Sequence, residues 1–239
     1  MKESIISIVL TAVLFFTILT VDKTRNVSSD KMIITNAPTI IIDAGHGGED
    51  GGAVVQNDVV EKDINLAIAQ KTNELLSLLG FQTYMVRDSD KLIYDSDSKT
   101  QRQKKNSDLR NRLSLMNKFE NCIYISIHQN KFDDDKVWGA QTFYSPNDEN
   151  SPILAEFVQS SIISLIQPNN KRVIKKTGTN VFVIYNATKP AIMVECGFMS
   201  NNDELFKLKD NNYQNQMSFS ISNGILNYYI SEVKNGSEV

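Results

Sequence analysis

The 239-residue sequence is poor in the residues that most often reveal a binding partner or a cross-link. It contains two histidines, two cysteines and one tryptophan, and its formal net charge is -3. No basic stripe with interleaved aromatic residues occurs, so nucleic acid is not an expected partner. The one basic run, residues 101–105, has polar flanks and indicates a solvated loop. No internal repeat or appended binding module is visible in the sequence.

Two cysteines allow at most one disulfide, and their positions argue against it. Cys122 opens the apolar run CIYISIH, and Cys196 lies near the end of AIMVEC. If both runs are parallel strands, Cys122 lies ~20 Å below the strand end at ~3.3 Å per residue. A disulfide needs Cα atoms within about 7 Å of each other. We therefore predict two free, mostly buried thiols.

Charged residues are absent from residues 4–21, which form an almost wholly apolar stretch. As a helix this stretch would be ~27 Å long, close to the ~30 Å hydrocarbon core of a bilayer. No small-x-small cleavage site follows it, so residues 1–21 are predicted to be an export signal retained as a membrane anchor. A cleaved signal peptide with an atypical site is the alternative. Residues 22–37 are polar and indicate a linker, residues 38–233 form one domain, and residues 234–239 are a tail.

The domain alternates between short apolar, β-branched runs and segments of helical period. Strands separated by helices imply βαβ units. The predicted fold class is therefore α/β: a single domain with a mostly parallel twisted sheet of about six strands and helices on both faces. Strands are expected from Thr39, Phe81, Cys122, Gly139, Asn180 and Ala191, helices over residues 61–79, 107–118, 152–166 and 213–231, and a polar loop over residues 88–106.

Four reactive side chains are predicted to meet at one edge of this sheet. His46 follows the first strand, His128 ends CIYISIH, and Glu195 lies at the end of AIMVE. Glu61 opens the first helix, after a loop that could return it to the same edge. Sites in open α/β sheets gather beyond the carboxyl ends of the strands. The positions of these residues thus indicate one shared site.

The residue types at this edge are those of a zinc site in a hydrolase. Such sites often use two histidines and one carboxylate and leave a position for water, whose pKa then falls toward ~7. Glu49, in an HxxE pair with His46, and Glu61 are rival candidates for the carboxylate, and spacing alone leaves both open. A dinucleotide-binding loop at GHGG is excluded, because Asp50 stands where that motif needs glycine. If both histidines hold one ion, their nearest ring nitrogens must lie within about 5 Å of each other.

The segments IIDAGHGGEDGGA, EKDINLA, SIHQN and KPAIMVECGFMSN resemble, in order, the sequence blocks of the zinc N-acetylmuramoyl-L-alanine amidases of the amidase-3 family. The resemblance extends from about Thr39 to the last helix. It implies that His46, Glu61 and His128 hold one Zn²⁺ per chain, that Glu195 is the catalytic acid/base, and that Glu49 has no metal role. It also implies hydrolysis of the amide between the muramic acid lactyl group and L-alanine in peptidoglycan. Gln129 and Cys196 depart from the usual residues of these blocks, but neither is a ligand position.

The stretches DLRNRLSLMN, WGAQTFYS and IYNATKPAIMVECGF resemble the sporulation and germination-specific members that prepare the spore cortex. This resemblance implies an exported enzyme at the outer face of the cytoplasmic membrane or in the cell wall, in the spore cortex space. A muramic acid deacetylase would be its partner in forming muramic δ-lactam, and the need for an accessory activating envelope protein is left open. The alternatives are a general amidase of growth and division, a zinc carboxypeptidase acting on stem peptides, and a non-catalytic envelope scaffold.

Three further residues are candidates for substrate contact. Asn130 lies just past His128, where it could bind substrate or simply form a turn. Arg87 ends the second strand and could meet a peptide carboxylate or form a structural ion pair. Trp138, the only tryptophan, could contact a sugar or pack in the core.

Overall fold

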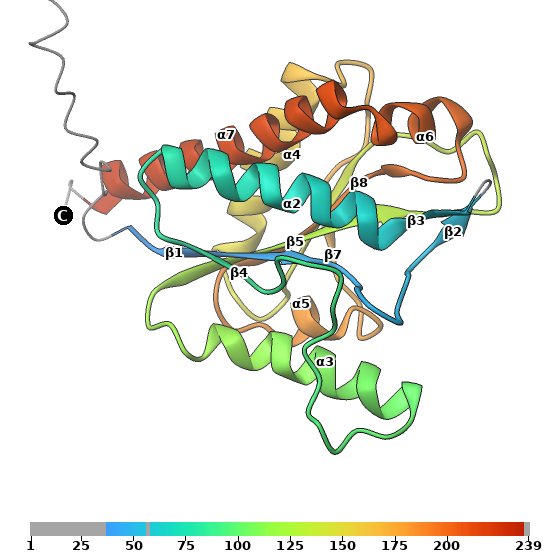
Figure 1. Ribbon diagram of the computed structural model, residues 1–239. Helices are drawn as coiled ribbons and strands as arrows, with labels where there is room; N and C mark the ends of the chain where they lie inside the picture. The colour runs from blue at the N-terminus through green and yellow to red at the C-terminus, as the bar shows by residue number, and fades with distance from the viewer. Residues whose placement is uncertain (1–36, 56–57, 237–239) are drawn as a thin grey trace, which may run out of the picture. The chain divides into compact units, whose positions relative to one another are not determined.

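The computed structural model describes residues 37–55 and 58–236, which contain a six-stranded sheet with helices on both faces (Figure 1). The strand order is β4-β1-β5-β8-β6-β7, and every neighbouring pair is parallel except β6 and β8. The α/β prediction with a mostly parallel sheet is confirmed. The strands are β1 (Thr39–Ala44), β4 (Thr83–Met85), β5 (Cys122–Asn130), β6 (Gln141–Tyr144), β7 (Lys175–Lys176) and β8 (Ala191–Phe198), with a separate hairpin of β2 (Val54–Val55) and β3 (Val59–Val60).

The helices divide between the two faces of the sheet. In Figure 1, α2, α4, α6 and α7 lie on one face, and α3 and α5 lie on the other. Helix α2 packs on β1 and β5, α4 packs on β6 and β8, and α7 covers both helices from outside. The bounds are α2 (Glu61–Leu78), α3 (Gln101–Met116), α4 (Ser151–Leu165), α5 (Phe182–Asn186), α6 (Asn202–Lys209) and α7 (Asn211–Gly236).

Alternation along the central strands fills a separate core on each face of the sheet. In β1, Ile40 and Ile42 pack beneath α2, whereas Ile41 joins the cluster on the α3 and α5 side. In β5, Ile125 packs toward α2 and Tyr124 toward α3. Because both faces are covered, these strands are apolar at nearly every position, as is typical of a buried parallel sheet.

Two predicted elements differ from those of the structure. The run from Asn180 is helix α5 rather than a strand, because a short apolar run can bury its side chains in either form; Val183 and Ile184 pack beside β8. The sixth strand of the sheet is instead β7, at the edge next to β6. The run 101–105 is the first part of α3 rather than a loop. Thr100 forms a capping box with Gln103 that starts this helix six residues before the predicted position.

The carboxyl ends of β1, β5 and β8 lie side by side. Ala44 pairs with Ile127, and His128 pairs with Glu195, so the residues that follow these strands share one rim of the sheet. The prediction of two free, buried thiols is confirmed, since Cys122 lies at the far end of β5 from this rim while Cys196 lies close to it.

Within the described ranges, no helix combines the length and apolarity needed to cross a bilayer. The predicted membrane anchor, residues 1–21, lies outside these ranges, as does the predicted linker up to residue 36. Helix α7 continues to Gly236, into the segment predicted as a tail.

A buried charge cluster joins α3 to the end of β1. Arg112, which is 2% exposed, forms ion pairs with Asp43 and with Asp108, the latter at 2.7 Å between Nε and Oδ2. Ser126 donates a further hydrogen bond to Asp43 at 2.8 Å. Burial raises the pKa of Asp43, but the Arg112 charge, the nearby charge of His128 and the Ser126 hydrogen bond together outweigh burial and keep that pKa below its usual range. The cluster holds α3 against the rim where the reactive residues gather.

Replacing Arg112 with methionine should destabilise the protein by about 3–5 kcal/mol, because it leaves two buried carboxylates without their cation. The loss can be measured as a change in the free energy of unfolding in urea. Arg110→Met is the matched control on the same helix, since Arg110 is exposed and should change stability by less than about 0.5 kcal/mol. Equal effects of the two substitutions would contradict a stabilising role for the cluster.

Candidate metal centre

Glu61 connects the two histidines. It is the first residue of α2 and is 4% exposed. Its Oε1 lies 3.0 Å from Nδ1 of His128, and its Oε2 lies 3.3 Å from Nε2 of His46. The two oxygens also accept hydrogen bonds from the backbone N–H groups of Gln129 and Ala53 and from the side chain of Asn65, at 3.1, 2.9 and 3.1 Å. The N-terminal end of a helix favours a negative charge at this position.

His46 is held in an uncommon backbone conformation. Its φ is 61°, in the left-handed region that non-glycine residues seldom adopt. Arg112 donates a hydrogen bond to the His46 carbonyl at 2.7 Å, and Arg87 donates to the carbonyls of Ala44 and Gly45 at 2.8 and 2.9 Å. These bonds hold the turn after β1, and they keep the imidazole directed toward Glu61.

Glycines make room for the two imidazole rings. A Cβ at Gly45 would lie 2.2 Å from Cε1 and Nε2 of His128, well inside van der Waals contact. A Cβ at Gly52, whose φ is +70°, would lie 2.5 Å from Oε2 of Glu61 and 2.6 Å from Cδ2 of His46. The rings therefore approach the backbone so closely that no side chain fits at either position.

The donor atoms of His46, Glu61 and His128 all lie within 4.8 Å of one another. The predicted limit of about 5 Å between the histidine nitrogens is met. Two imidazoles and one carboxylate that converge in this way suit a zinc ion with an open coordination position. Glu49 does not join the cluster, because its carboxylate pairs with Lys104 at 2.7 Å.

The negative charge gathered around His46 suits a cation site. Burial lowers the pKa of His46, but hydrogen bonds to Asp50 and Glu61 outweigh it and raise this pKa to about 9. Burial has the opposite effect on the carboxyl group of Glu61 and raises its pKa. Hydrogen bonds with His128 and His46 outweigh burial and bring the pKa of Glu61 far below its usual range. Asp50 lies 3.0 Å from Nδ1 of His46, on the side of the ring away from Glu61. A carboxylate in that position fixes the ring tautomer and leaves the other nitrogen free to bind metal.

Glu195 is the neighbouring carboxylate with the opposite electrostatics. It pairs with His128 across β5 and β8, and its buried Oε2 has no hydrogen-bond partner among the described residues. Burial raises the pKa of Glu195 to about 7; the charge of His128 opposes this shift and that of Glu61 adds to it. A carboxyl group with such a pKa can both accept and donate a proton near neutral pH.

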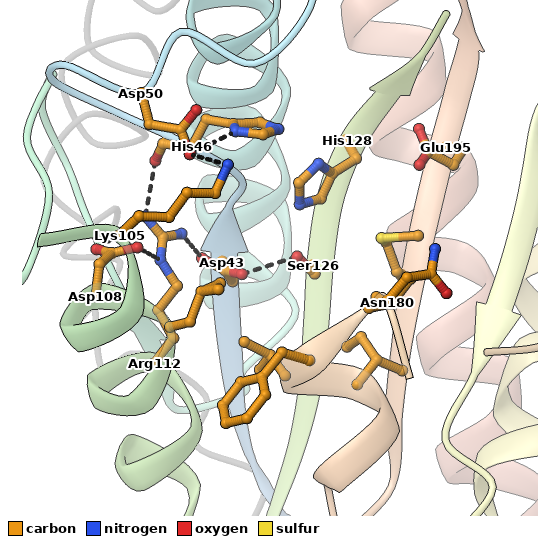
Figure 2. Close-up of a pocket in the computed structure, with 16 residues that line it drawn as sticks. Asp43, His46, Asp50, Lys105, Asp108, Arg112, Ser126, His128, Asn180 and Glu195 are labelled. Carbon is orange, nitrogen blue, oxygen red and sulfur yellow. Dashed lines mark hydrogen bonds and ion pairs between the residues drawn. The ribbon is translucent and has the colours of Figure 1, made fainter. Parts of the chain in front are cut away.

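These groups open into a cavity of about 240 Å³. Figure 2 shows His46, His128 and Glu195 in a row across the ends of the central strands. Helix α3 lines one wall with Lys105, Asp108, Leu109 and Arg112, and the segment 180–184, which leads into α5, lines the other. The structure therefore brings the four predicted residues of the site together beside an open cavity.

The three candidates for substrate contact do not line this cavity. Arg87 is 1% exposed and donates to four backbone carbonyls, so it supports the His46 turn and is not available to a peptide carboxylate. Asn130 pairs with Phe198 beyond an irregularity in β5, and its carbonyl accepts a hydrogen bond from Met199. Trp138 is 44% exposed, so it is not a core residue, and it borders a separate depression near α6.

Sequence reasoning missed two contributors to the site. Asp50 served only to exclude a nucleotide loop, although an acidic residue four positions after His46 could have suggested a partner for its ring. Lys105 lay in a run predicted to be a solvated loop. No sequence signal placed Lys105 in the cavity, because that depends on where α3 packs.

Comparison with known proteins gives a consistent result. Residues 40–227 match the amidase-3 family of N-acetylmuramoyl-L-alanine amidases. The chain is 34% identical over 190 residues to the germination-specific N-acetylmuramoyl-L-alanine amidase of Bacillus subtilis, covering 80% of this chain and 79% of the relative. Its fold is similar to that of the CwlD amidase of Clostridioides difficile, which was solved in complex with the GerS lipoprotein. The TM-score is 0.77 and the identity is 36%, and the match covers 80% of this chain and 98% of the CwlD chain. An N-acetylmuramoyl-L-alanine amidase of Clostridium difficile 630 is also similar, with a TM-score of 0.71, 31% identity, and coverage of 82% and 99%.

Replacing Gly45 with alanine should weaken zinc binding at least about tenfold, because the added methyl displaces the ring of His128. The affinity can be measured by competition with a chromophoric zinc chelator. Gly178→Ala is the control, since its methyl would meet only the flexible amide end of Asn180. Unchanged zinc affinity in Gly45→Ala would refute the role assigned to this close approach.

Proposed function

This chain belongs to the amidase-3 family and is an N-acetylmuramoyl-L-alanine amidase, a hydrolase of peptidoglycan; we propose that it works with zinc and acts in maturation of the spore cortex. The observation that carries the zinc proposal is that donor atoms of His46, Glu61 and His128 converge within 4.8 Å of one another. Glu195, whose pKa is raised to about 7, lies beside them. The proposed reaction is hydrolysis of the amide between the muramic acid lactyl group and L-alanine.

The protein's own groups supply the proton transfers. Glu195 in its ionised form accepts a proton from the attacking water and then delivers it to the alanine nitrogen, because an amine leaves poorly unless it is protonated. A pKa near 7 makes the carboxyl group suitable for both steps. When bound, zinc supplies Lewis acidity to the amide carbonyl and to the water. Asp50 keeps His46 in the tautomer that the site needs.

The proposed role in the cortex rests on the named relatives. A germination-specific amidase and the CwlD amidase are each more than 30% identical to this chain over most of its length. Removing the stem peptide leaves the lactyl carboxyl group of muramic acid free. A muramic acid deacetylase in the same pathway would free the amine, and the two groups could then close to muramic δ-lactam.

The setting proposed for this reaction is the outer face of the cytoplasmic membrane or the cell wall, in the spore cortex space. The apolar residues 4–21 support export and attachment to the membrane. The CwlD structure contains the GerS lipoprotein, which supports the idea that an envelope protein assists this chain as well.

A general role in growth or division is the second candidate. It is supported by 29% identity to part of the Bacillus subtilis amidase LytC, of which the chain covers 35%. The zinc carboxypeptidase alternative draws no support from these relatives.

Digestion of purified peptidoglycan tests the activity directly. The wild-type protein loaded with zinc should release intact stem peptides with new alanine amino termini, detectable by mass spectrometry of the muropeptides. Free terminal amino acids would instead show a carboxypeptidase. The cortex role predicts that spores lacking this protein contain no muramic δ-lactam, and normal δ-lactam content would favour the general amidase.

Two alanine substitutions should separate chemistry from metal binding. Glu195→Ala should keep its zinc and lose roughly two to four orders of magnitude in rate, the range for a positioned acid/base. Glu61→Ala should bind zinc weakly, because it removes a ligand and the partner of both histidines. Metal content by atomic absorption and the initial rate on muropeptides are the measurements. Loss of zinc from Glu195→Ala would contradict the assignment of Glu195 as the acid/base rather than a metal ligand.

A further inference from the structure

Lys105 is the cationic side chain of the cavity wall that a ligand can reach. It comes from α3, and its side chain is 54% exposed. Arg112, the other cation lining the cavity, is 2% exposed and is already engaged by two carboxylates and two backbone carbonyls. Of the lysines and arginines among the described residues that line the cavity, Lys105 is therefore the one whose charge a substrate can reach.

The lining also contains four carboxylates, beside several apolar side chains from the segment 181–184. Asp43, Asp50, Asp108 and Glu195 all face the cavity, and Glu61 lies beside it. Arg112 balances Asp43 and Asp108, so Asp50 and Glu195 are the lining carboxylates that would repel an anionic peptide. Acceptance of such a peptide therefore needs a positive charge in a defined place. The Lys105 ammonium lies 3.2 Å from Oδ2 of Asp50, which lies 3.0 Å from His46. Figure 2 shows the Lys105 side chain extended along the cavity toward these two residues.

We infer that Lys105 determines specificity for the stem peptide, by binding the free α-carboxylate of the acidic residue that follows the L-alanine. This inference rests on the proposed amidase function. A carboxylate two residues from the scissile amide lies at most ~7 Å from it along the peptide chain. Lys105 lines the same cavity as His46 and Glu195, and two contacts of 3.0 and 3.2 Å through Asp50 separate it from Nδ1 of His46. The four-carbon stem of lysine lets the ammonium turn from Asp50 to a second carboxylate without moving the helix.

A purely structural role for Lys105 makes a different prediction. If Lys105 only holds Asp50 beside His46, its removal should weaken the metal site and affect every substrate equally. A substrate contact should instead affect only peptides that carry the carboxylate. Measuring two substrates separates these roles.

The experiment compares two substrates of the zinc-loaded full chain: a muropeptide whose second stem residue is glutamate with a free α-carboxylate, and its amidated isoglutamine form. The wild-type protein should favour the acidic form by about fivefold in kcat/KM, the size expected of a partly exposed ion pair, and the difference should lie in KM. Lys105→Met should treat both forms alike while retaining its zinc. Lys105→Arg should retain part of the preference, because it keeps the charge.

Arg102→Met is the matched control. It removes one positive charge from the same end of α3, at an exposed residue that does not line the cavity, and it should keep the wild-type preference. The same preference in Lys105→Met as in wild type would overturn the inference while leaving the amidase function intact. A loss of zinc in Lys105→Met, with equal loss of rate on both substrates, would also overturn it. Failure of the wild-type protein to release alanine amino termini from either substrate would refute the proposed function itself, and the inference with it.

Discussion

One carboxylate, that of Glu61, joins the three parts of the chain that form the site. It contacts the histidine that follows β1, the histidine near the end of β5, and the backbone just before β2. Such a buried charge would be costly without partners, and five donors surround it. The start of α2 adds the favourable end of the helix dipole. Because these donors come from separate segments, the site forms only when the sheet and α2 are packed.

The turn after β1 needs a second kind of support. His46 adopts a left-handed conformation, and such conformations persist only where the surrounding structure determines them. Two buried arginines supply that support: Arg87 and Arg112 between them hold the carbonyls of residues 44, 45 and 46. Two side chains that could have been substrate-binding cations are thus used to hold a strained backbone, and the cavity is left with Lys105.

Glu61 and Glu195, two carboxylates of the same candidate site, have opposite protonation behaviour. Hydrogen bonds with the histidines keep Glu61 ionised against the effect of burial, as a ligand must be, whereas burial without a hydrogen-bond partner for Oε2 raises the pKa of Glu195. Environments that push two neighbouring carboxyl groups apart in pKa are the physical basis for assigning them different roles. The difference arises from their neighbours alone, since both side chains are glutamate.

The sequence by itself determined the strands β1, β5 and β8 and the position of a reactive residue at or just beyond the end of each. Apolar, β-branched runs and the strand-end rule depend on local composition, and the chain's two histidines made a shared metal site the simplest interpretation. The choice of Glu61 over Glu49 came from the resemblance to the family and not from spacing. Only the tertiary structure decided that Glu49 turns to Lys104, that Arg87 is buried under the turn, and that the run from Asn180 is a helix. Each of these depends on which distant segment packs against the residue, and in a parallel sheet such neighbours are set by long crossovers rather than by local pattern.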